Sequence, residues 1–462
     1  MSVLARICCI FTLVFNPTFF GFAKREAFQS FKVVVYNVEN LFDVDDVSLY
    51  DDYRMGMYGI NELENKLDAI VSVLKKIGGE SGPDIILLQE IEVDRTPKKN
   101  RSATEELLRE LKLHGLGPYK YRLGYDPKNS PDSWPSVHCL TLSKFPITES
   151  RLHQLERARP ILETTHLIDG QSFTLFNNHW KSGASSPKME ILRIQNAEVL
   201  RKRIDEILKQ DPTIDFLVGG DLNSHYNQST VYRNVMDRTG INDVLHSTGT
   251  EPPGKSNGGK LYNLWHELEP DERGSDAWRG KWGTLMHILL PDTLYDTKGV
   301  HYVTDSFQVE SWSRHNKIEG LEIPFKWSNE LNGFGTSDHF PLSAQFMTNG
   351  GRTAKGKNYT KVETNQRSID YEGAKKNASF WNQSKLNPKN FGKTFYFTGI
   401  VSKKKPFCLK INELEMGIYS FDSQTKESLF SHSIGEKISC YGYLSRYRGN
   451  WQFIVAKNDW IE

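Results

Sequence analysis

The stretch FLVGGDLNS at residues 216–224 ends an apolar run with two glycines, an aspartate and an asparagine. The apolar residues predict a buried strand, and Gly219 and Gly220 allow a sharp turn at its end. A carboxylate at Asp221 beside a neutral donor at Asn223 suits a site that handles a metal ion, a water molecule or a phosphate. An Asx turn that closes a loop explains the same residues. This stretch alone therefore does not decide between a functional and a structural role.

Polar residues terminate an apolar run in four other places, and each place alone has a structural explanation. A glutamate at a strand end is usually solvated, and a histidine usually satisfies a hydrogen bond. The set is more informative, because polar strand ends in a layered α/β fold converge on one rim. The residues are Asn37 and Glu39 in VVVYNVENLFD, Gln89 and Glu90 in IILLQEIE, Asn178, His179 and Lys181 in FTLFNNHWKSG, and Ser337, Asp338 and His339 in GFGTSDHFPL.

The elements that must position these residues alternate between strands and helices. Apolar runs predict strands within residues 31–42, 82–92, 136–147, 173–180 and 214–218. Helical spacing of apolar residues predicts helices at 65–77 and 189–210. This alternation predicts an α/β domain that spans residues 30–348.

The composition is that of a globular protein, with 38% hydrophobic and 25% charged residues in a chain of 462. This length predicts two or three domains. The formal net charge is +1, so any attraction to a polyanion must come from the distribution of charge. The sequence does not indicate an oligomeric state.

The first residues have the layout of a secretory signal peptide. Arg6 precedes an apolar stretch, and Gly21 and Ala23 have the spacing of a cleavage site, which predicts a signal peptide at residues 1–23. A membrane anchor is the alternative, but Pro17 interrupts the run, which is shorter than the roughly 20 residues of a spanning helix. We therefore expect a secreted or periplasmic protein without stable membrane insertion.

The character of the chain changes near residue 349. Residues 352–410 contain 14 Lys or Arg against 3 Asp or Glu, which predicts a polar, basic linker over 349–378. Short strand patterns without a helix of convincing length then predict a small OB-fold-like barrel over 379–462, with a small β-sandwich as the alternative. Cys408 and Cys440 lie in this region; they could form a disulfide or, with equal reason, be buried as thiols.

The five polar blocks together resemble the endonuclease/exonuclease/phosphatase superfamily of deoxyribonuclease I-like enzymes. The resemblance covers roughly residues 31–346 with the blocks in the order of the family, and NVENLFD and NHWKSG are most similar to its secreted bacterial nucleases. It implies a four-layer α/β sandwich, in which two sheets pack face to face and helices lie outside them.

The resemblance also implies roles for individual residues. Glu90 and Asp338, with help from Asn37, would hold a divalent cation, and such oxygen ligands suit Mg²⁺ or Mn²⁺ as a substitute. Asp221 would orient or deprotonate the attacking water. The remaining residues would bind the phosphate or, in one case, protonate the leaving oxygen: Asn223, His339 and His179.

One block departs from the family. Many relatives have an aspartate that orients the histidine of the last block, and Met286 in KWGTLMHILLP stands where it would fall. A thioether cannot orient an imidazolium. Asp276 or Asp305 are candidates to replace that aspartate, and a weakened enzyme that only binds nucleic acid is an alternative.

The C-terminal region favours a nucleic-acid substrate, DNA or RNA, cut with little sequence preference. Basic residues there lie near aromatic ones in the sequence, as in proteins that bind single strands. The predicted substrate contacts are Asn178, Lys181, Lys404 and Arg446. A sphingomyelinase-like phospholipase is the second hypothesis, because the aromatic residues Trp312, Phe325, Trp327 and Phe334 could form a hairpin that enters a bilayer interface.

Overall fold

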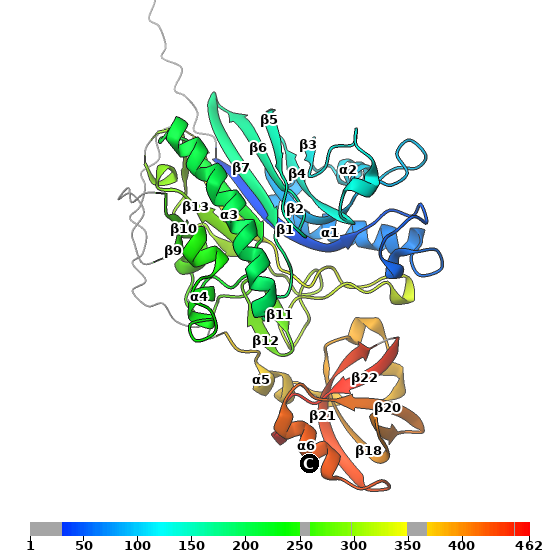
Figure 1. The fold of residues 1–462 in the computed structure, drawn as a ribbon. Helices are drawn as coiled ribbons and strands as arrows, with labels where there is room; N and C mark the ends of the chain where they lie inside the picture. Colours follow the sequence, from blue (N-terminus) through cyan, green and yellow to red (C-terminus); the bar gives the residue numbers. More distant parts are fainter. Residues whose placement is uncertain (1–29, 250–258, 297, 349–366, 448) are drawn as a thin grey trace, which may run out of the picture.

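The computed structural model describes residues 30–249, 259–296, 298–348, 367–447 and 449–462. The predicted signal peptide and residues 349–366 of the predicted linker lie outside the described residues. The chain forms an α/β unit and then a smaller β unit, drawn in orange and red in Figure 1. No helix of the described residues is long and apolar enough to cross a membrane.

Two sheets of seven strands form the centre of the larger unit, as far as the chain is described. The first sheet has the order β14-β16-β1-β2-β4-β3, with β15 beside β16. Its strands are β1 (Ser30–Leu41), β2 (Ile85–Glu92), β3 (Lys120–Leu123), β4 (Val137–Ser143), β14 (Val300–Tyr302), β15 (Gln308–Val309) and β16 (Leu342–Thr348).

The second sheet has the order β5-β6-β7-β8-β13-β10-β9. Its strands are β5 (Ile147–His153), β6 (Ile161–Ile168), β7 (Gln171–His179), β8 (Phe216–Asp221), β9 (Ser247–Thr248), β10 (Leu261–Asn263) and β13 (Met286–Leu290). A separate pair of strands, β11 (Asp276–Trp278) and β12 (Lys281–Gly283), forms a small ribbon. The helices of this unit are α1 (Ile60–Gly78), α2 (Ala103–Leu113), α3 (Pro187–Gln210) and α4 (Gln228–Val231).

Alternation along the central strands builds the layers. In β1, Val33 and Val35 pack between the two sheets, while Val34 and Tyr36 pack toward α1 and α2. The far face of the second sheet packs against α3 (Figure 1). The order is therefore helices, sheet, sheet, helix, which confirms the predicted four-layer α/β sandwich.

Each of the two glycines of FLVGGDLNS is required by a different close contact. A Cβ on Gly219 would lie 3.0 Å from Leu87 and Val35 of the opposing sheet, so a side chain there would separate the sheets. Gly220 has φ +133°, and a Cβ on it would lie 2.0 Å from the carbonyl oxygen of Asn178 on the adjacent strand. Gly220 therefore permits the close approach of β7 and β8 directly before Asp221.

The smaller unit contains a closed five-stranded barrel. Its strands are β18 (Thr394–Lys404), β19 (Phe407–Ile411), β20 (Leu414–Tyr419), β21 (Lys437–Tyr447) and β22 (Asn450–Ile454), and the pairing of β18 with β21 closes it. β17 (Ser379–Phe380) adds to the outside of β18. The helix α6 (Ser423–Ser431) lies between β20 and β21, so the expectation that this region lacks a helix of convincing length was wrong. Cys408 and Cys440 are buried free thiols.

The two units share a hydrophobic core rather than touching at a point. Trp282 and Phe340 of the larger unit belong to the same buried cluster as Trp381 and Phe395 of the smaller one. The helix α5 (Tyr371–Lys376), which falls within the predicted linker, joins this cluster through Ala374.

The aromatic segment considered as a membrane hairpin packs at this boundary. Phe325 stacks on Phe391 of the smaller unit with ring centroids 6.0 Å apart, and Phe334 lies 5.9 Å from the same ring. Trp327 is 5% exposed, and Trp312 packs against the α1 and α2 core. These four aromatic residues therefore do not form an exposed hairpin.

The steric role of Gly220 yields a stability prediction. Gly220→Ala should lower the free energy of unfolding by about 3 kcal/mol or more, because the added methyl group meets backbone atoms that cannot move aside. Gly170→Ala is the matched control, since Gly170 has φ +81° but open space around its Cβ; it should cost about 1 kcal/mol. Denaturant unfolding of both variants tests this, and equal losses would contradict it.

Candidate active site

Strand alternation carries three of the predicted residues to one place between the sheets. Asn37 continues the series of Val33 and Val35 that faces the second sheet. His179 and Asp221 likewise follow inward-facing residues of β7 and β8, and the two are paired in register. The C-terminal ends of these strands therefore meet at one edge of the sandwich.

Glu90 reaches the same place through an irregularity. Simple alternation would turn its side chain toward α1 and α2 with Leu88. Glu90 instead has φ +67°, at a register shift between β2 and β4. Glu39 and Asn223 also have positive φ values, of 53° and 48°. Backbone strain of this kind in non-glycine residues tends to occur at functional sites, where bulges redirect side chains.

The amide of Asn37 joins the two sheets. Its Nδ2 donates hydrogen bonds to Glu90 Oε1 and to Asp221 Oδ2, both at 3.0 Å. Its Oδ1 accepts a hydrogen bond from the backbone N of Glu39. Asn37 therefore orients both carboxylates, and its amide oxygen keeps a second lone pair that could help to hold a cation.

Two imidazoles face these carboxylates. His179 Nε2 lies 3.6 Å from Glu90 Oε1 and 3.8 Å from Asp221 Oδ2. His339 Nε2 lies 3.7 Å from Asp221 Oδ2 and 3.6 Å from Asp338 Oδ1. Asp221 therefore stands between the two histidines.

The block with Ser337, Asp338 and His339 is hydrogen-bonded to β1. Ser337 Oγ donates to the carbonyl of Asn37 at 2.7 Å and accepts from the backbone N of His339. The buried Lys66 of α1 donates hydrogen bonds to the carbonyl oxygens of Glu39 and Thr336. It therefore connects the end of β1 to the segment that carries Ser337 and His339. Lys66 was not identified from the sequence, because a lysine in an amphipathic helix is normally solvated.

Asp221 has both roles that the sequence left open. Its Oδ1 accepts a hydrogen bond from the backbone N of Asn223 at 2.9 Å, which is the Asx turn. Its Oδ2 faces Asn37 and the two imidazoles. Asn223 Nδ2 donates to the carbonyl of Trp180, which holds the amide at the edge of the site.

The carboxylates carry more negative charge than their surroundings neutralise. Burial raises the pKa of Glu90, and the charge of Asp338 adds to this effect. Burial likewise raises the pKa of Asp221. Burial and the charge of Asp338 raise the pKa of Glu39 to about 7, against partial compensation by Lys326 and Lys66.

The two histidines differ in charge at neutral pH. Burial lowers the pKa of His179 well below its ordinary value, so that this imidazole is neutral. Burial alone would lower the pKa of His339 as well, but the charges of Asp338, Asp221 and Asp276 outweigh it and raise the pKa to about 9. His339 is therefore a cationic donor next to a carboxylate.

These features fit a divalent cation held by Glu90 and Asp338. The oxygen donors are of the type that Mg²⁺ and Mn²⁺ take. Burial, with the charge of Asp338 in addition, raises the pKa of Glu90, and a cation would offset both effects. Asp338 keeps 42% of its side chain exposed, so the site is open to solvent on its side.

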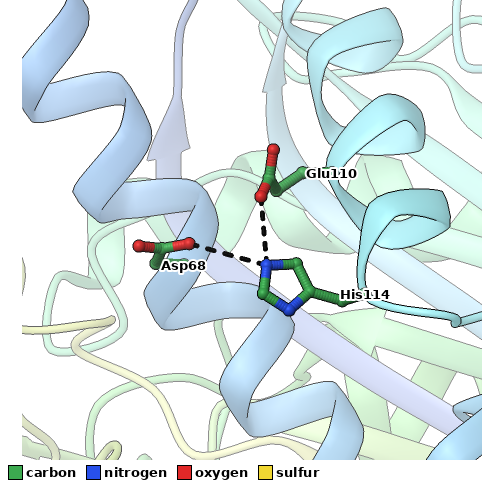
Figure 2. A group of neighbouring side chains, drawn as sticks. All are labelled: Asp68, Glu110 and His114. Atoms are coloured by element: carbon green, nitrogen blue, oxygen red, sulfur yellow. Dashed lines mark hydrogen bonds and ion pairs between the residues drawn. The ribbon is translucent and has the colours of Figure 1, made fainter.

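A second group of possible ligands lies elsewhere on the surface. Figure 2 shows His114 at the end of α2, whose Nε2 lies 3.1 Å from Glu110 Oε1 and 3.9 Å from Asp68 Oδ1 on α1. Asp68 and His114 are exposed. Ion pairing between the two helices accounts for this group, and none of its members contacts the candidate active site.

Of the two candidates for the family aspartate, Asp276 is the one whose backbone lies next to that of His339. Met286 is buried between the sheets, paired in register with Asp221. Asp276 forms a β-bridge with His339, and its Oδ1 accepts a hydrogen bond from the backbone N of Leu285, next to Met286. His339 Nδ1 is buried without a hydrogen-bond partner in the described structure, and the negative charge of Asp276 is one of those that raise the pKa of His339. Asp305 lies exposed in a turn after β14.

The predicted substrate contacts are placed differently. Asn178 is fully buried, and alternation turns it away from His179; its amide bonds to Phe176, Gly219 and Trp180. Lys181 follows β7 with a partly exposed side chain.

Two further predicted contacts belong to the smaller unit. Lys404 donates to the carbonyls of Phe430 and His432, and so holds the end of α6. Arg446 forms an ion pair with Glu330 of the larger unit. Asn178, Lys404 and Arg446 therefore have structural partners, and we do not retain them as substrate contacts.

Arg159 is a site residue that the sequence analysis missed. It lies two residues before β6, and continuing the pairing of β6 with β7 places it beside the end of β7. Its charge lowers the pKa values of Glu90 and His179. No hydrogen bond or ion pair engages its guanidinium within the described chain. Arg159 lies in a loop outside any strand-end pattern, so its residue type and spacing do not mark it.

Comparison with known proteins identifies the family. Residues 32–348 match the endonuclease/exonuclease/phosphatase family. The chain therefore belongs to this family, whose members hydrolyse phosphodiester bonds and generally use divalent metal ions. No curated protein sequence matches the chain.

Solved structures of distant sequence are similar to the larger part of the chain. TDP2 from Caenorhabditis elegans is 16% identical, with a TM-score of 0.41 over 69% of this chain and 75% of its own. A Bacteroides thetaiotaomicron protein of the family is 14% identical, with a TM-score of 0.41 over 70% and 96%. The beta toxin of Staphylococcus aureus is 18% identical, with a TM-score of 0.37 over 68% and 99%.

The placement of Asp276 predicts that it positions His339. Asp276→Asn should lower turnover about tenfold or more, because an amide cannot stabilise the imidazolium. It should also lower the pKa of His339, measured by NMR titration of the imidazole. Asp305→Asn is the matched control and should change neither quantity. An unaltered imidazole titration in Asp276→Asn would contradict the assignment.

The raised carboxyl pKa values predict how the stability of the metal-free protein depends on pH. Glu39 has an ordinary pKa of 4.5 and a folded pKa of about 7. The folded protein therefore holds more protons than the unfolded chain in this range, and stability should fall as pH rises through it, by on the order of a few kcal/mol.

Added Mg²⁺ should restore much of the loss at pH 8, because a cation stabilises the ionised carboxylates. Melting temperatures at pH 5 and pH 8, with chelator or Mg²⁺, test this. His114→Ala should respond like the unmodified protein, whereas Glu90→Gln should lose most of the Mg²⁺ effect. Equal Mg²⁺ responses in those two variants would assign the cation to neither.

Proposed function

We propose that this protein is a divalent-metal-dependent nuclease that hydrolyses the phosphodiester bonds of DNA or RNA with little sequence specificity. The single observation that carries the proposal is the convergence of Glu90, Asp221, His179, His339 and Asp338 from both sheets on one edge. A buried carboxylate between two imidazoles of different charge matches the needs of phosphodiester hydrolysis.

The chain's own residues divide the chemistry among themselves. Asp221 Oδ2 orients the attacking water and takes its proton. His339, as an imidazolium, donates a hydrogen bond to a phosphate oxygen and stabilises the charge that grows there. Asp276 holds that imidazolium in place. The cation held by Glu90 and Asp338 would supply further positive charge to the phosphate.

The neutral donors complete the site. His179 is uncharged, so it suits hydrogen bonding to the phosphate. When the water oxygen bonds to phosphorus and the P–O bond to the leaving oxygen breaks, the leaving oxygen takes its proton from solvent, which reaches the site beside the partly exposed Asp338. Asn223 offers the second hydrogen of its amide, since Trp180 engages only one.

Arg159 and Lys181 add positive charge at the rim, where a backbone phosphate next to the scissile one would lie.

The predicted signal peptide at residues 1–23 supports the proposal that the enzyme acts in the periplasm or outside the cell. The phospholipase alternative loses its main support, because Phe325 and Phe334 are covered by Phe391.

Activity measurements test the proposal. Purified protein with Mg²⁺ should degrade single-stranded DNA or RNA, and a chelator should stop the reaction. Glu90→Gln and His339→Ala should each lower turnover by roughly three orders of magnitude, because they remove charge that the transition state requires.

Glu80→Gln is the matched control, since Glu80 is exposed and forms only a surface ion pair with Lys75. It should retain full activity. Release of phosphocholine from sphingomyelin with intact nucleic acid would replace this proposal by the phospholipase. Near-normal turnover in both site variants would show that the site is wrongly assigned.

A further inference from the structure

Three aromatic side chains form a row on the outside of the smaller unit. In the β-sheet register, Phe380 of β17 pairs with Tyr396 of β18, and Tyr396 pairs with Tyr441 of β21. The ring centroids of Phe380 and Tyr396 lie 5.6 Å apart, and those of Tyr396 and Tyr441 lie 4.9 Å apart. We call these three residues the aromatic row.

The aromatic row is not part of the barrel core. The neighbours that alternate with its members, Phe395, Phe397 and Cys440, point inward and are buried. Phe380 is 79% exposed. The core is thus complete without the aromatic row, and exposed apolar side chains that gather in one place mark a binding surface.

The aromatic row lines a groove of about 700 Å³ together with charged residues of α5 and of the last strand region. Lys375 Nζ lies 5.0 Å from the ring centroid of Tyr441. Lys376 is exposed at the groove and has no ion pair within the described chain. Glu372 and Glu462 also line the groove, so it offers acceptors as well as cations.

The same outer face continues along the strands toward two further lysines. Two residues beyond Tyr396 and before Tyr441, the hydroxyls of Thr398 and Ser439 are 2.7 Å apart. Two residues further, Ile400 pairs with Lys410 on one side and Lys437 on the other. The face therefore presents rings, then hydroxyls, then cationic groups.

We propose that this face, on β17, β18 and β21, binds a single-stranded segment of nucleic acid. Bases stack on exposed aromatic rings whatever their sequence, and lysines next to the rings attract the phosphate backbone. Glu372 and Glu462 can accept hydrogen bonds from base amino groups. This inference rests on the proposed function, because it names the surface that would hold the substrate outside the active site.

The alternative occupant of an aromatic-lined groove is a proline-rich peptide. Such a peptide would use the rings but gain little from Lys376, Lys410 and Lys437. Rings and cations on a single face favour a ligand with both flat apolar groups and negative charge, which a polynucleotide has.

Binding measurements on the full chain test the proposal. A fluorescent single-stranded oligonucleotide of mixed base sequence and about 12 nucleotides is titrated with protein, and anisotropy is read in chelator so that no cleavage occurs. Phe380→Ala and Tyr441→Ala should each raise Kd about tenfold. Lys437→Glu should weaken binding and lower the slope of log Kd against log salt by about 1.

Two matched controls separate the aromatic row from general surface effects. Phe421→Ala removes another exposed aromatic side chain of the same unit, and Lys209→Glu reverses a charge at the end of α3 on the larger unit. Both should bind like the unmodified protein. Equal Kd values in the row variants and the controls would overturn the proposal, as would displacement of the oligonucleotide by a neutral proline-rich peptide.

The outcomes also distinguish this proposal from the proposed hydrolysis. If Phe380→Ala weakens oligonucleotide binding but no nucleic acid is ever cleaved, the binding face stands and the nuclease assignment falls. If nucleic acid is cleaved while Phe380→Ala and Tyr441→Ala bind as tightly as the unmodified protein, only the binding face falls.

Discussion

The buried amide of Asn37 is the contact on which the candidate active site depends. It donates to Glu90 from its own sheet and to Asp221 from the opposing sheet. Two buried carboxylates that approach the same amide would repel each other. The shared neutral donor Asn37 lowers the cost of bringing them together. The inter-sheet spacing, the close-packed Gly219 and the strand ends all serve to bring these three side chains within hydrogen-bonding distance.

Buried carboxyl groups and residues with strained backbone conformations surround this contact. Glu39, Glu90 and Asn223 take left-handed conformations, and several carboxyl groups are buried with raised pKa values. Such features lower stability and persist only where the surrounding packing enforces them. Two sets of hydrogen bonds hold these conformations in place: those of the buried Lys66 ammonium on α1, and that of Ser337 with β1.

Strand periodicity in the sequence was enough to predict the layered fold and the meeting of Asn37, His179 and Asp221. The same periodicity turns Asn178 to the opposite face of β7 from His179. Strand alternation alone was therefore enough to remove Asn178 from the predicted substrate contacts. The α2 helix was missed although Ser102 and Glu105 form the capping-box pattern that signals its start. α6 is short and only weakly amphipathic, and the surrounding strand patterns obscured it.

Other features depended on long-range packing and could not be predicted. The turn of Glu90 into the site follows from a bulge in the pairing with β4, which no local pattern encodes. Asp276 lies 63 residues before His339 in the chain, and only the β-bridge between them shows that they are neighbours. The ion pair of Arg446 with Glu330 likewise joins two units whose docking is invisible in either segment alone.

The contact of Phe391 with both Phe325 and Phe334 links the smaller unit to the wall of the active site. The segment that carries these two phenylalanines also includes Trp327, whose backbone N donates to Glu39 Oε2 beside the active site. The smaller unit therefore helps to support the wall of the active site, and its removal would expose an apolar surface there. A homologue without it would need to cover this apolar surface by other means.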